Sequence, residues 1–506
     1  MDELTPLRLS NLDRMPAGVA VPGYARADLT PGIVHIGLGN FHRAHQAWFT
    51  HRLMQSRQAL DWAIIGAGVR PGDGTMRARL LAQDCLSTLI ELDPAGKSAE
   101  VTGAMIDFLP VEPDNAALIA RMAAPEIRIV SLTVTEGGYY IDPITGGLDV
   151  AHPDIHHDAA HPETPRTAFG AMVAALRLRR ARGAGPFTGL CCDNLQGNGA
   201  ILRQTVVGLA RLSDPALADW IDANCSFPSS MVDCIVPATG PREIALARGF
   251  GIDDAAPVTH ERFRQWVIED DFCAGRPDWD RVGAVFSDDV HLYETMKIRI
   301  LNGGHQVIGG AGELLGLGTI AAAMAHDGIR AMFRKLLREE IAPHVAPAPG
   351  VSVSEYIGLI ERRFANPEIV DTTRRVAFDG SSRHAGFIVP SIRDGLRKGT
   401  AVDGLALVSV LWARYCAGMR EDGTPIEAND PLWPVLHAAA LTARSRPEAW
   451  LERVPVYGDL KNAPRFARAF CAWYETMKAH GVAAAIARYV DDPQAVRARA
   501  GAPPRP

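Results

Sequence analysis

The chain has 506 residues, 47% of them hydrophobic and 22% charged, and a formal net charge of −6 at pH 7. This length exceeds what a single hydrophobic core usually covers, so we expect two domains of a soluble globular protein. The negative charge argues against a protein that grips nucleic-acid backbones, and no apolar run approaches the ~20 residues needed to cross a bilayer.

The N-terminal stretch and the cysteines bear on the cellular compartment. The stretch MDELTPLRLSNLDR mixes charges of both signs and lacks the apolar segment of a signal peptide. Of the eight cysteines only Cys191 and Cys192 are adjacent, and the sequence contains no C-x-x-C pair. We therefore expect reduced thiols and a cytoplasmic protein that binds neither membrane nor nucleic acid.

Apolar runs alternate with helical patterns over the first half of the chain. The predicted strands are residues 33–38, 62–69, 127–134 and 187–194. The predicted helices are the stretch after Gly39 and residues 75–82, 114–123 and 166–182. Strands that alternate with helices favour an α/β fold with a doubly wound parallel sheet.

Two segments of this half are predicted to be exposed. Residues 142–165 are rich in Pro, His and Asp and are expected to form a long surface loop. The short basic run from Arg177 to Arg182 is expected to be the exposed end of a helix.

The character of the sequence changes near residue 290. Beyond it the patterns are long and helical, with few β-branched runs. We therefore expect a first domain of residues 1–288 and a second, mostly α-helical domain of residues 289–506.

A glycine pair follows the first predicted strand. Gly37-x-Gly39 stands where the strand passes into a helix, and glycine there permits a tight turn and close approach of a pyrophosphate to the backbone. The full G-x-G-x-x-G fingerprint is not met, because the third position is His42. By itself the pair is equally compatible with a structural turn.

Asp73 follows the second predicted strand. A carboxylate at this place accepts hydrogen bonds from the adenosine ribose of NAD and repels the 2′-phosphate of NADP. It lies 34 residues after Gly39, against the usual ~20. Arg70 nearby keeps NADP open as an alternative, and a loop-tip acid in a PGDG turn is the structural alternative.

The stretch MKIRILNGGH opens the second predicted domain. At ~100° per residue, Lys297, Asn302 and His305 fall within an arc of about 140° on one helix. A lysine accepts a proton near neutral pH only if burial or a neighbouring cation lowers its pKa. Asn302, and Asn194 at the end of a predicted strand, can donate N–H bonds to a developing alkoxide. The structural alternatives are a surface lysine and an asparagine that ends a helix.

A histidine cluster is the candidate for metal chemistry. Two pairs within it have the four-residue spacing that places histidines on one helix face. Pro153 and Pro162 argue against a helix here, so the cluster is expected to be a solvated loop. The sequence also contains no H-E-x-x-H motif, and we expect no metal site. The members of the cluster are His152, His156, His157 and His161.

Six stretches spread along the chain resemble one known family. They are HIGLGNFHRAHQAWFT, TVTEGGYYID, CDNLQGNG, FPSSMVD, EDDFCAGRPDWDRVG and MKIRILNGGH. Together they are similar to the mannitol dehydrogenase family of polyol-specific long-chain dehydrogenases, from about residue 30 to 490. The Lys-x4-Asn-x2-His arrangement after an E-x-M tripeptide matches the signature of that family.

The resemblance implies a Rossmann-type N-terminal domain, a mostly helical C-terminal domain and a small-molecule substrate. It further implies a metal-independent, NAD-dependent enzyme that interconverts D-mannitol and D-fructose, and it favours a monomer. A fructuronate or tagaturonate reductase of the same family remains an alternative, as does a non-catalytic NAD-binding protein. The stretch DGSSRHAGFIVPSIRDGL resembles the polyol branch.

The resemblance also assigns roles to residues. Lys297 corresponds to the general base, Asn194 and Asn302 to the pair that stabilises the oxyanion, and His305 to the histidine that holds the substrate. Further positions match residues that contact the substrate (Asp233 and Arg375), an acid near the proton exit path (Glu136), and the cofactor site (Gly37, Leu38, Gly39, Asn40, Phe41 and Asp73). NAD-preferring relatives can carry two acids after the second strand, and here the first of these positions is Gly72, which weakens the preference for NAD over NADP.

Overall fold

The computed structural model describes residues 4–142 and 145–491, apart from the side chain of Glu136. By its internal contacts the chain divides into two compact units, Met1–His291 and Leu292–Pro506.

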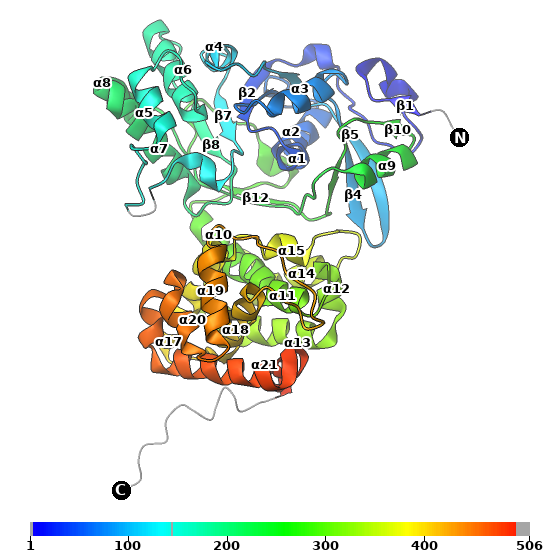
Figure 1. The fold of residues 1–506 in the computed structure, drawn as a ribbon. Coiled ribbons are helices and arrows are strands. Elements are labelled where there is room, and N and C mark those ends of the chain that lie inside the picture. The colour runs from blue at the N-terminus through cyan, green and yellow to red at the C-terminus, as the bar shows by residue number, and fades with distance from the viewer. Residues whose placement is uncertain (1–3, 143–144, 492–506) are drawn as a thin grey trace. The chain divides into compact units, whose positions relative to one another are not determined.

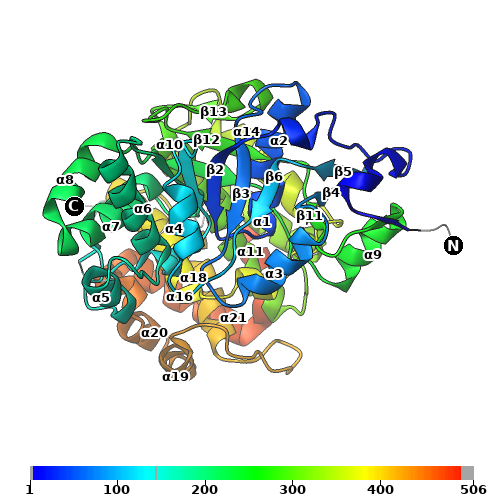
Figure 2. The same ribbon diagram turned by 90° about the horizontal axis from the view of Figure 1, so that it is seen from above.

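A five-stranded parallel sheet is the centre of the first unit (Figures 1 and 2). Its strands follow the order β6-β3-β2-β7-β8, and every neighbouring pair is parallel. The order reverses between β2 and β7, which is the kind of switch point at which open α/β sheets bind ligands. The predicted doubly wound sheet is therefore confirmed. The strands are β2 (Pro31–Ile36), β3 (Ala63–Ala67), β6 (Met105–Phe108), β7 (Ile129–Leu132) and β8 (Thr188–Cys191).

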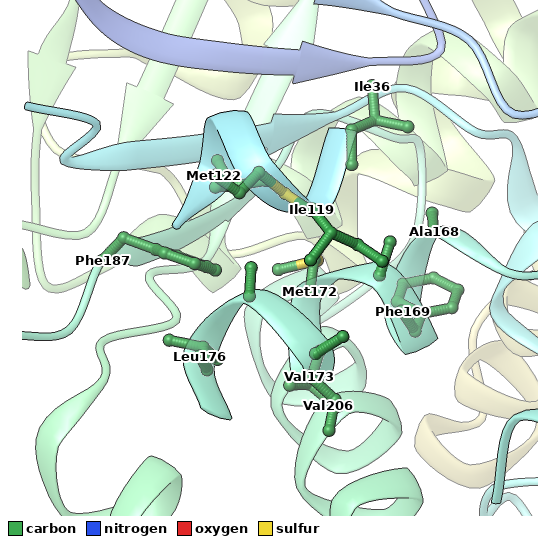
Figure 3. Packing of buried hydrophobic residues seen from close by; sticks show 14 of the residues in the cluster. Ile36, Ile119, Met122, Ala168, Phe169, Met172, Val173, Leu176, Phe187 and Val206 are labelled. Atoms are coloured by element: carbon green, nitrogen blue, oxygen red, sulfur yellow. The ribbon is translucent and has the colours of Figure 1, made fainter. Parts of the chain in front are cut away.

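Both faces of this sheet are covered, which explains why its strands are apolar throughout. Successive side chains of a strand point to opposite faces. Val34 and Ile36 therefore pack with helices α4, α6 and α7 on one face (Figure 3), while Ile33 packs with α2 on the other. Each fully buried aliphatic side chain of this kind contributes about 1.5–3 kcal/mol.

The described part of the first unit contains three smaller sheets, which were not predicted from the sequence. In the first, β11 pairs with the hairpin of β4 and β5; in the second, β12 lies between β9 and β13; the third pairs β1 with β10. The strands are β1 (Thr5–Pro6), β4 (Ser87–Asp93), β5 (Gly96–Thr102), β9 (Ser230–Asp233), β10 (Ile252–Asp253), β11 (Val258–His260), β12 (Gln265–Ile268) and β13 (Val285–Phe286).

The four helical stretches predicted in the first unit are confirmed, with one division, whereas α5, α7, α8 and α9 were not predicted. The stretch after Gly39 forms two helices rather than one, because His45 (φ −122°, ψ −99°) leaves the helical region between them. The α-helices are α1 (Asn40–Ala44), α2 (Gln46–Gln55), α3 (Asp73–Leu81), α4 (Ala116–Met122), α5 (Pro153–Ala160), α6 (Ala168–Arg182), α7 (Asn198–Ser213), α8 (Pro215–Asn224) and α9 (Pro241–Gly249). Short 3₁₀ turns cover Leu9–Arg14 (η1), Arg26–Asp28 (η2), Glu136–Tyr139 (η3) and Trp279–Val282 (η4).

The prediction of a loop over residues 142–165 was wrong for α5. Pro153 occupies the first turn of this helix, where its missing N–H costs nothing and its fixed φ favours helix. His152 caps the helix by accepting a hydrogen bond from the backbone N–H of Asp154. The carboxylate of Asp158 then accepts the N–H and the hydroxyl of Thr167, which ties α5 to the start of α6.

The prediction that the whole basic run 177–182 is exposed was also wrong. Arg179 is 1% exposed, and its guanidinium donates hydrogen bonds to backbone carbonyls at the end of α4 and in the two loops that precede β7 and β8. Such loop carbonyls would otherwise be buried without partners, so this arginine satisfies them. The accepting residues are Met122, Ala124, Ile127, Ala184, Gly185 and Pro186.

Within the described residues of the second unit, the regular elements are all helices (Figure 1). The nearly buried α18 packs against α11, α19 and α21, and α21 is interrupted at Gly481 (φ +84°). Three turns are π-helical, namely Lys297–Asn302 (η5), Leu337–Ile341 (η6) and His384–Ile388 (η8).

The remaining helical elements of this unit complete the α-rich architecture that the sequence predicted. They are α10 (Val290–Met296), which spans the division between the units, α11 (Gly303–Leu314), α12 (Ile320–Ala325), α13 (Asp327–Leu336), η7 (Ala342–His344), α14 (Val353–Phe364), α15 (Thr373–Val376), α16 (Gly380–Arg383), α17 (Val389–Lys398), α18 (Asp403–Cys416), α19 (Trp433–Ala443), α20 (Glu448–Arg453), η9 (Pro455–Asn462) and α21 (Pro464–Asp491). Over residues 4–142 and 145–491, none of the helices combines the length and the apolar character that a membrane span requires.

Candidate active site

The turn between β2 and α1 requires glycine at its first position. Gly37 has φ +89°, and a Cβ on it would lie 2.3 Å from the carbonyl oxygen of Thr133. The hydroxyl of Thr133 donates to the carbonyl of Gly37 at 2.8 Å, which fixes the turn against the end of β7. Gly39 is under no such constraint, since a Cβ there would meet only the oxygen of Gly37 at 4.0 Å. In the described part of the chain, no side chain therefore covers the backbone of Gly39, which follows Leu38. A pyrophosphate site needs backbone that is open in this way.

His42 stands where the dinucleotide fingerprint has its third glycine. Its ring is 1% exposed and stacks on that of His35, with centroids 3.4 Å apart and planes inclined by 15°. His35 is bonded in turn to the hydroxyls of Ser131 and Thr133. Burial lowers the pKa of His35 to about 3 and that of His42 well below its ordinary value, so both rings are neutral. In dinucleotide-binding folds, glycine at this position allows the helix to lie close to the strand. Here the stacked rings of His35 on β2 and His42 on α1 make the contact between strand and helix instead.

Asn40 and Phe41 contribute backbone rather than free side chains to this turn. The amide of Asn40 donates to the carbonyl of Pro237 at 3.0 Å and to the hydroxyl of Thr239 at 2.8 Å. The ring of Phe41 stacks on His45 with centroids 4.8 Å apart. Their side chains therefore hold the turn in place.

Asp73 is the first residue of α3 and lies just beyond the carboxyl end of β3. Its Oδ2 accepts the backbone N–H groups of Val69 and Arg70, both at 3.0 Å, which closes the loop between strand and helix. Among residues 4–142 and 145–491, its Oδ1 has no hydrogen-bond partner. The carboxylate thus fixes the turn, as in the structural alternative, and keeps one oxygen for a ribose hydroxyl.

The carboxyl ends of β7 and β8 are joined by Asp193. Its carboxylate accepts the N–H groups of Val134 and Thr135, each at 3.0 Å, and the hydroxyl of Tyr139 at 2.7 Å. Asn194 follows directly and is exposed. Glu136 begins η3, and its side chain lies outside the described part of the structure.

Asn198 ties this edge to β9. Its amide donates to the carbonyls of Asp193 at 3.1 Å and Ser230 at 2.8 Å, and its oxygen accepts the N–H of Ser230 at 2.9 Å. Asp233, the last residue of β9, is 5% exposed. Within the first unit, Asn198 therefore connects the segment just after β8, where Asn194 lies, to β9, which ends at Asp233.

In the second unit, Lys297 begins a π-helical turn that ends at Asn302. Its side chain is nearly buried, at 7% exposure, so the alternative of a surface lysine was wrong. The helix also continues through Gly303 (φ −59°, ψ −43°), so Asn302 does not end it. Because a π turn closes from residue i to i+5 rather than i+4, the spacing of 100° per residue does not hold between Lys297 and His305.

His305 lies one turn further along and is packed against an aromatic ring. Its imidazole stacks on Phe364, with centroids 4.2 Å apart and planes inclined by 17°. Gly304 makes room for this packing, since a Cβ there would lie 2.9 Å from Phe333 and 3.4 Å from Phe364. Burial lowers the pKa of His305 to about 3, so the ring is neutral at physiological pH.

Arg375 is held beside His305 by Asp371. Its Nε and Nη2 each donate to one carboxylate oxygen of Asp371 at 2.5 Å, and Oδ2 of the same carboxylate is 3.9 Å from Nε2 of His305. Thr372 caps α15 by accepting the backbone N–H of Arg375 at 3.1 Å. Lys297, Asn302, His305 and Arg375 thus all belong to the second unit.

Three residues that hold the site in place were missed in the sequence, namely Asp193, Asn198 and Asp371. Two of them lie close in sequence to residues that were predicted. Asp193 directly precedes Asn194, and Asp371 stands four residues before Arg375, a common ion-pair spacing. Asn198 carries no signal of this kind. Among the described residues, no group of three or more His, Cys, Asp or Glu side chains is arranged to hold a metal ion.

Two family models match most of the chain. The Mannitol dehydrogenase Rossmann domain matches residues 31–281, and the Mannitol dehydrogenase C-terminal domain matches residues 289–478. The chain belongs to the mannitol dehydrogenase family. The predicted resemblance is therefore confirmed, and so is the predicted fold class of a Rossmann-type domain followed by a mostly helical one.

Relatives within the mannitol dehydrogenase family match over nearly the full length. Mannitol 2-dehydrogenase of Cereibacter sphaeroides is 56% identical over 476 residues, which are 94% of this chain and 100% of the relative. Mannitol 2-dehydrogenase of Pyricularia oryzae is 40% identical over 94% of this chain and 96% of its own.

Two solved structures of the same fold match this mannitol dehydrogenase family member. One is Pseudomonas fluorescens mannitol 2-dehydrogenase in a ternary complex with NAD and D-mannitol, with TM-score 0.88, 40% identity and coverage of 96% of this chain and 100% of that one. The other is a D-sorbitol dehydrogenase in substrate-free form, with TM-score 0.87, 32% identity and coverage of 95% and 99%.

Proposed function

We propose that this protein is an NAD-dependent, metal-independent polyol dehydrogenase that oxidises D-mannitol at C2 to D-fructose and catalyses the reverse reaction. The observation that carries the proposal is the 56% identity to the mannitol 2-dehydrogenase of Cereibacter sphaeroides. The match covers 94% of this chain and 100% of that relative. The solved relative that binds NAD and D-mannitol has the same fold at 40% identity.

The first unit offers the features that a dinucleotide needs. The uncovered backbone at Gly39, after the tight turn at Gly37, fits a pyrophosphate, with Leu38, Asn40 and Phe41 supplying the rest of the turn. The available Oδ1 of Asp73 fits a ribose hydroxyl and would repel a 2′-phosphate. NAD, when bound, supplies the hydride acceptor.

The base of the reaction is Lys297. Its neutral amine takes the proton of the C2 hydroxyl as the C2 hydride leaves, and returns it in the reduction of the ketose. The residue is 7% exposed, and burial is one of the conditions under which a lysine amine becomes neutral near physiological pH. Asn194 and Asn302 donate N–H bonds to the developing alkoxide without adding net charge.

Four further residues act on the substrate and its proton. His305 does not titrate near neutral pH, so it serves as a fixed hydrogen-bonding group for a substrate hydroxyl. Asp233 and Arg375 bind further hydroxyls, and Glu136 passes the proton to solvent. These roles follow the family resemblance of each position.

A substrate panel tests the proposal. The purified protein is given NAD or NADP with D-mannitol, D-sorbitol, D-arabinitol or D-mannonate, and formation of the reduced cofactor is followed by its absorbance. We expect the highest kcat/KM with NAD and D-mannitol. A preference for D-mannonate would instead identify a sugar-acid oxidoreductase, and binding of NAD without turnover of any substrate would identify a non-catalytic protein.

The proposal includes a monomeric protein of the cytoplasm. The expectation of a monomer comes from the family resemblance. The expectation of a cytoplasmic location comes from the scattered cysteines of the sequence. Light scattering coupled to gel filtration gives the mass in solution. A mass near 54.5 kDa is expected for the monomer.

A further inference from the structure

Asp371 holds Arg375 by both oxygens of a carboxylate that is almost removed from solvent. The side chain of Asp371 is 6% exposed, whereas that of Arg375 is 58% exposed. The pair uses Nε and Nη2, which form the side-on fork with which a guanidinium receives a carboxylate. One of the two forks of Arg375 is thus already occupied by an internal anion.

The buried carboxylate of Asp371 offsets the charge of Arg375 without using all of its donors. Within residues 4–142 and 145–491, the Nη1 of Arg375 has no hydrogen-bond partner, so its two N–H groups can donate to hydroxyls of a ligand. Because the carboxylate of Asp371 is buried, solvent and salt screen its effect on Arg375 less than they would between two exposed charges. The charge of Arg375 is therefore largely offset.

The charged side chains that act on His305 are those of Asp371 and three arginines. Arg363, Arg375 and Arg383 each act to lower the pKa of His305, while Asp371 acts in the opposite direction and more strongly than any one of them. Arg383 donates to the backbone carbonyls of Arg375 and Val376. Without Asp371, the guanidinium of Arg375 would lose the carboxylate that offsets its charge.

The backbone of Asp371 is anchored independently of its side chain. Its carbonyl accepts the N–H of Ile320 at 2.8 Å at the start of α12, and its own N–H donates to Ile369 at 3.0 Å. Replacing the carboxylate by an amide of the same shape therefore leaves these anchors in place. The substitution changes charge with little change in structure.

We propose that Asp371 is a specificity-determining positioning residue, which makes the substrate site select neutral polyols and ketoses over sugar acids by occupying and offsetting Arg375. The inference rests on the proposed function, because it assigns Arg375 to the substrate. It predicts that the choice between a hydroxyl and a carboxylate depends on a residue that contacts the arginine rather than the substrate.

The test is the substrate preference of Asp371→Asn. kcat/KM is measured for D-mannitol and D-mannonate in oxidation, and for D-fructose and D-fructuronate in reduction. We expect the ratio of sugar acid to neutral substrate to rise roughly 10- to 100-fold, the usual worth of one hydrogen bond to a charged group. A merely structural role would lower both values together and leave the ratio unchanged.

Glu313→Gln is the matched control. Glu313 is also a buried carboxylate of the second unit, 5% exposed, and its Oε2 pairs with Arg420 at 3.0 Å. This variant is expected to leave the ratio as in the parent. In the double variant Asp371→Asn with Arg375→Gln, the gain for sugar acids should disappear, because the freed cation is gone.

The outcomes separate the inference from the proposed function. A parent enzyme that oxidises D-mannitol, together with a folded Asp371→Asn variant of unchanged ratio, would overturn the inference alone. A parent that already prefers D-mannonate would overturn the proposed function. If Asp371→Asn does not fold, Asp371→Ser provides the same comparison with a smaller side chain, and the same rise in the ratio is required of it.

Discussion

Glu340 accepts a hydrogen bond from the hydroxyl of Tyr489 at 3.0 Å, across 149 residues of sequence. The same carboxylate accepts the N–H groups of Gly404 at 2.7 Å and Leu405 at 3.0 Å. It thereby serves as the cap of α18, the nearly buried helix of the second unit, and joins three segments of the chain.

Glu340→Ala should therefore destabilise the protein by about 2–4 kcal/mol, because two N–H groups at the start of α18 lose their acceptor in a buried place. Glu340→Gln keeps one acceptor oxygen and should cost less. Urea unfolding monitored by circular dichroism measures both. Equal stability of parent and alanine variant would show that the helix finds another cap.

The stability of the parent should also depend on the ionisation of Glu340. Burial raises its pKa from 4.5 to about 7 in the folded protein. A raised carboxyl pKa contributes stability below pH 4.5 that is lost as the pH rises through about 7. Glu340→Gln, which stays neutral, should show a smaller fall in unfolding free energy between pH 5 and 8.

His384 should produce the opposite dependence on pH. It stacks on Trp412 and bonds to the hydroxyls of Ser409 and Tyr457, and burial lowers its pKa to about 3. Between pH 6.5 and 3 the unfolded chain binds a proton here that the folded chain does not, so stability falls with falling pH. His384→Gln should reduce this slope by about 1.4 kcal/mol per pH unit between pH 4 and 6. An unchanged slope would show that His384 is already protonated in the folded state.

Lys297→Ala should lower polyol oxidation by roughly two to four orders of magnitude, the usual worth of one acid–base group. NAD affinity, measured by fluorescence titration, should change little. In the parent, oxidation should rise with pH as the amine loses its proton, and reduction should be favoured at lower pH. His305 cannot replace the lysine in this profile, since its pKa of about 3 keeps it neutral throughout. Near-parental activity with the same profile would place the base elsewhere.

Asp73→Ala should narrow the preference for NAD over NADP. The substitution removes both the acceptor for the ribose hydroxyl and the repulsion of a 2′-phosphate. kcat/KM with each cofactor gives the preference, and melting temperature reports the loss of the bonds to Val69 and Arg70. Equal or better turnover of NADP by the parent would contradict the role of Asp73.

Prolonged dialysis against EDTA should leave activity intact, because a lysine base and amide donors need no Lewis acid. Turnover of D-mannitol before and after dialysis is the measurement. Activity that is lost and then restored by zinc or manganese would direct attention to His152 and its neighbours on α5, where the rings of His157 and His161 lie 4.9 Å apart.

Regular, local patterns made much of the fold predictable. The apolar run at 62–69 contains β3, and the helical pattern at 166–182 contains α6. Both could be predicted because a buried strand and a buried helix face each give a characteristic spacing of apolar residues in the sequence. The helix after Pro153 was missed because proline was taken as a breaker, although it favours the first turn. The burial of Arg179 was missed because its carbonyl partners include residues up to 57 positions away in the sequence.

The spacing of residues in the sequence predicted less of the candidate site than of the fold. The roles of Lys297, Asn302 and His305 came from family resemblance, and these roles stay predictions, as does the division into a cofactor domain of 1–288 and a substrate domain of 289–506. The burial of Lys297 and the stack of His305 on Phe364 depend on tertiary packing. No local pattern in a sequence specifies such packing.

The π turn at Lys297–Asn302 has a consequence for how this helix tolerates change in length. It holds one residue more than an α turn of the same hydrogen-bonded span, so it takes up an extra residue between α10 and α11. Deleting a single residue within it would therefore let an uninterrupted α-helix form while the side chains of α10 and α11 keep nearly the same directions, whereas a deletion from a regular α-helix turns what precedes it by about 100°. The π turn is thus the place where this helix tolerates the loss of one residue with the least change in side-chain direction.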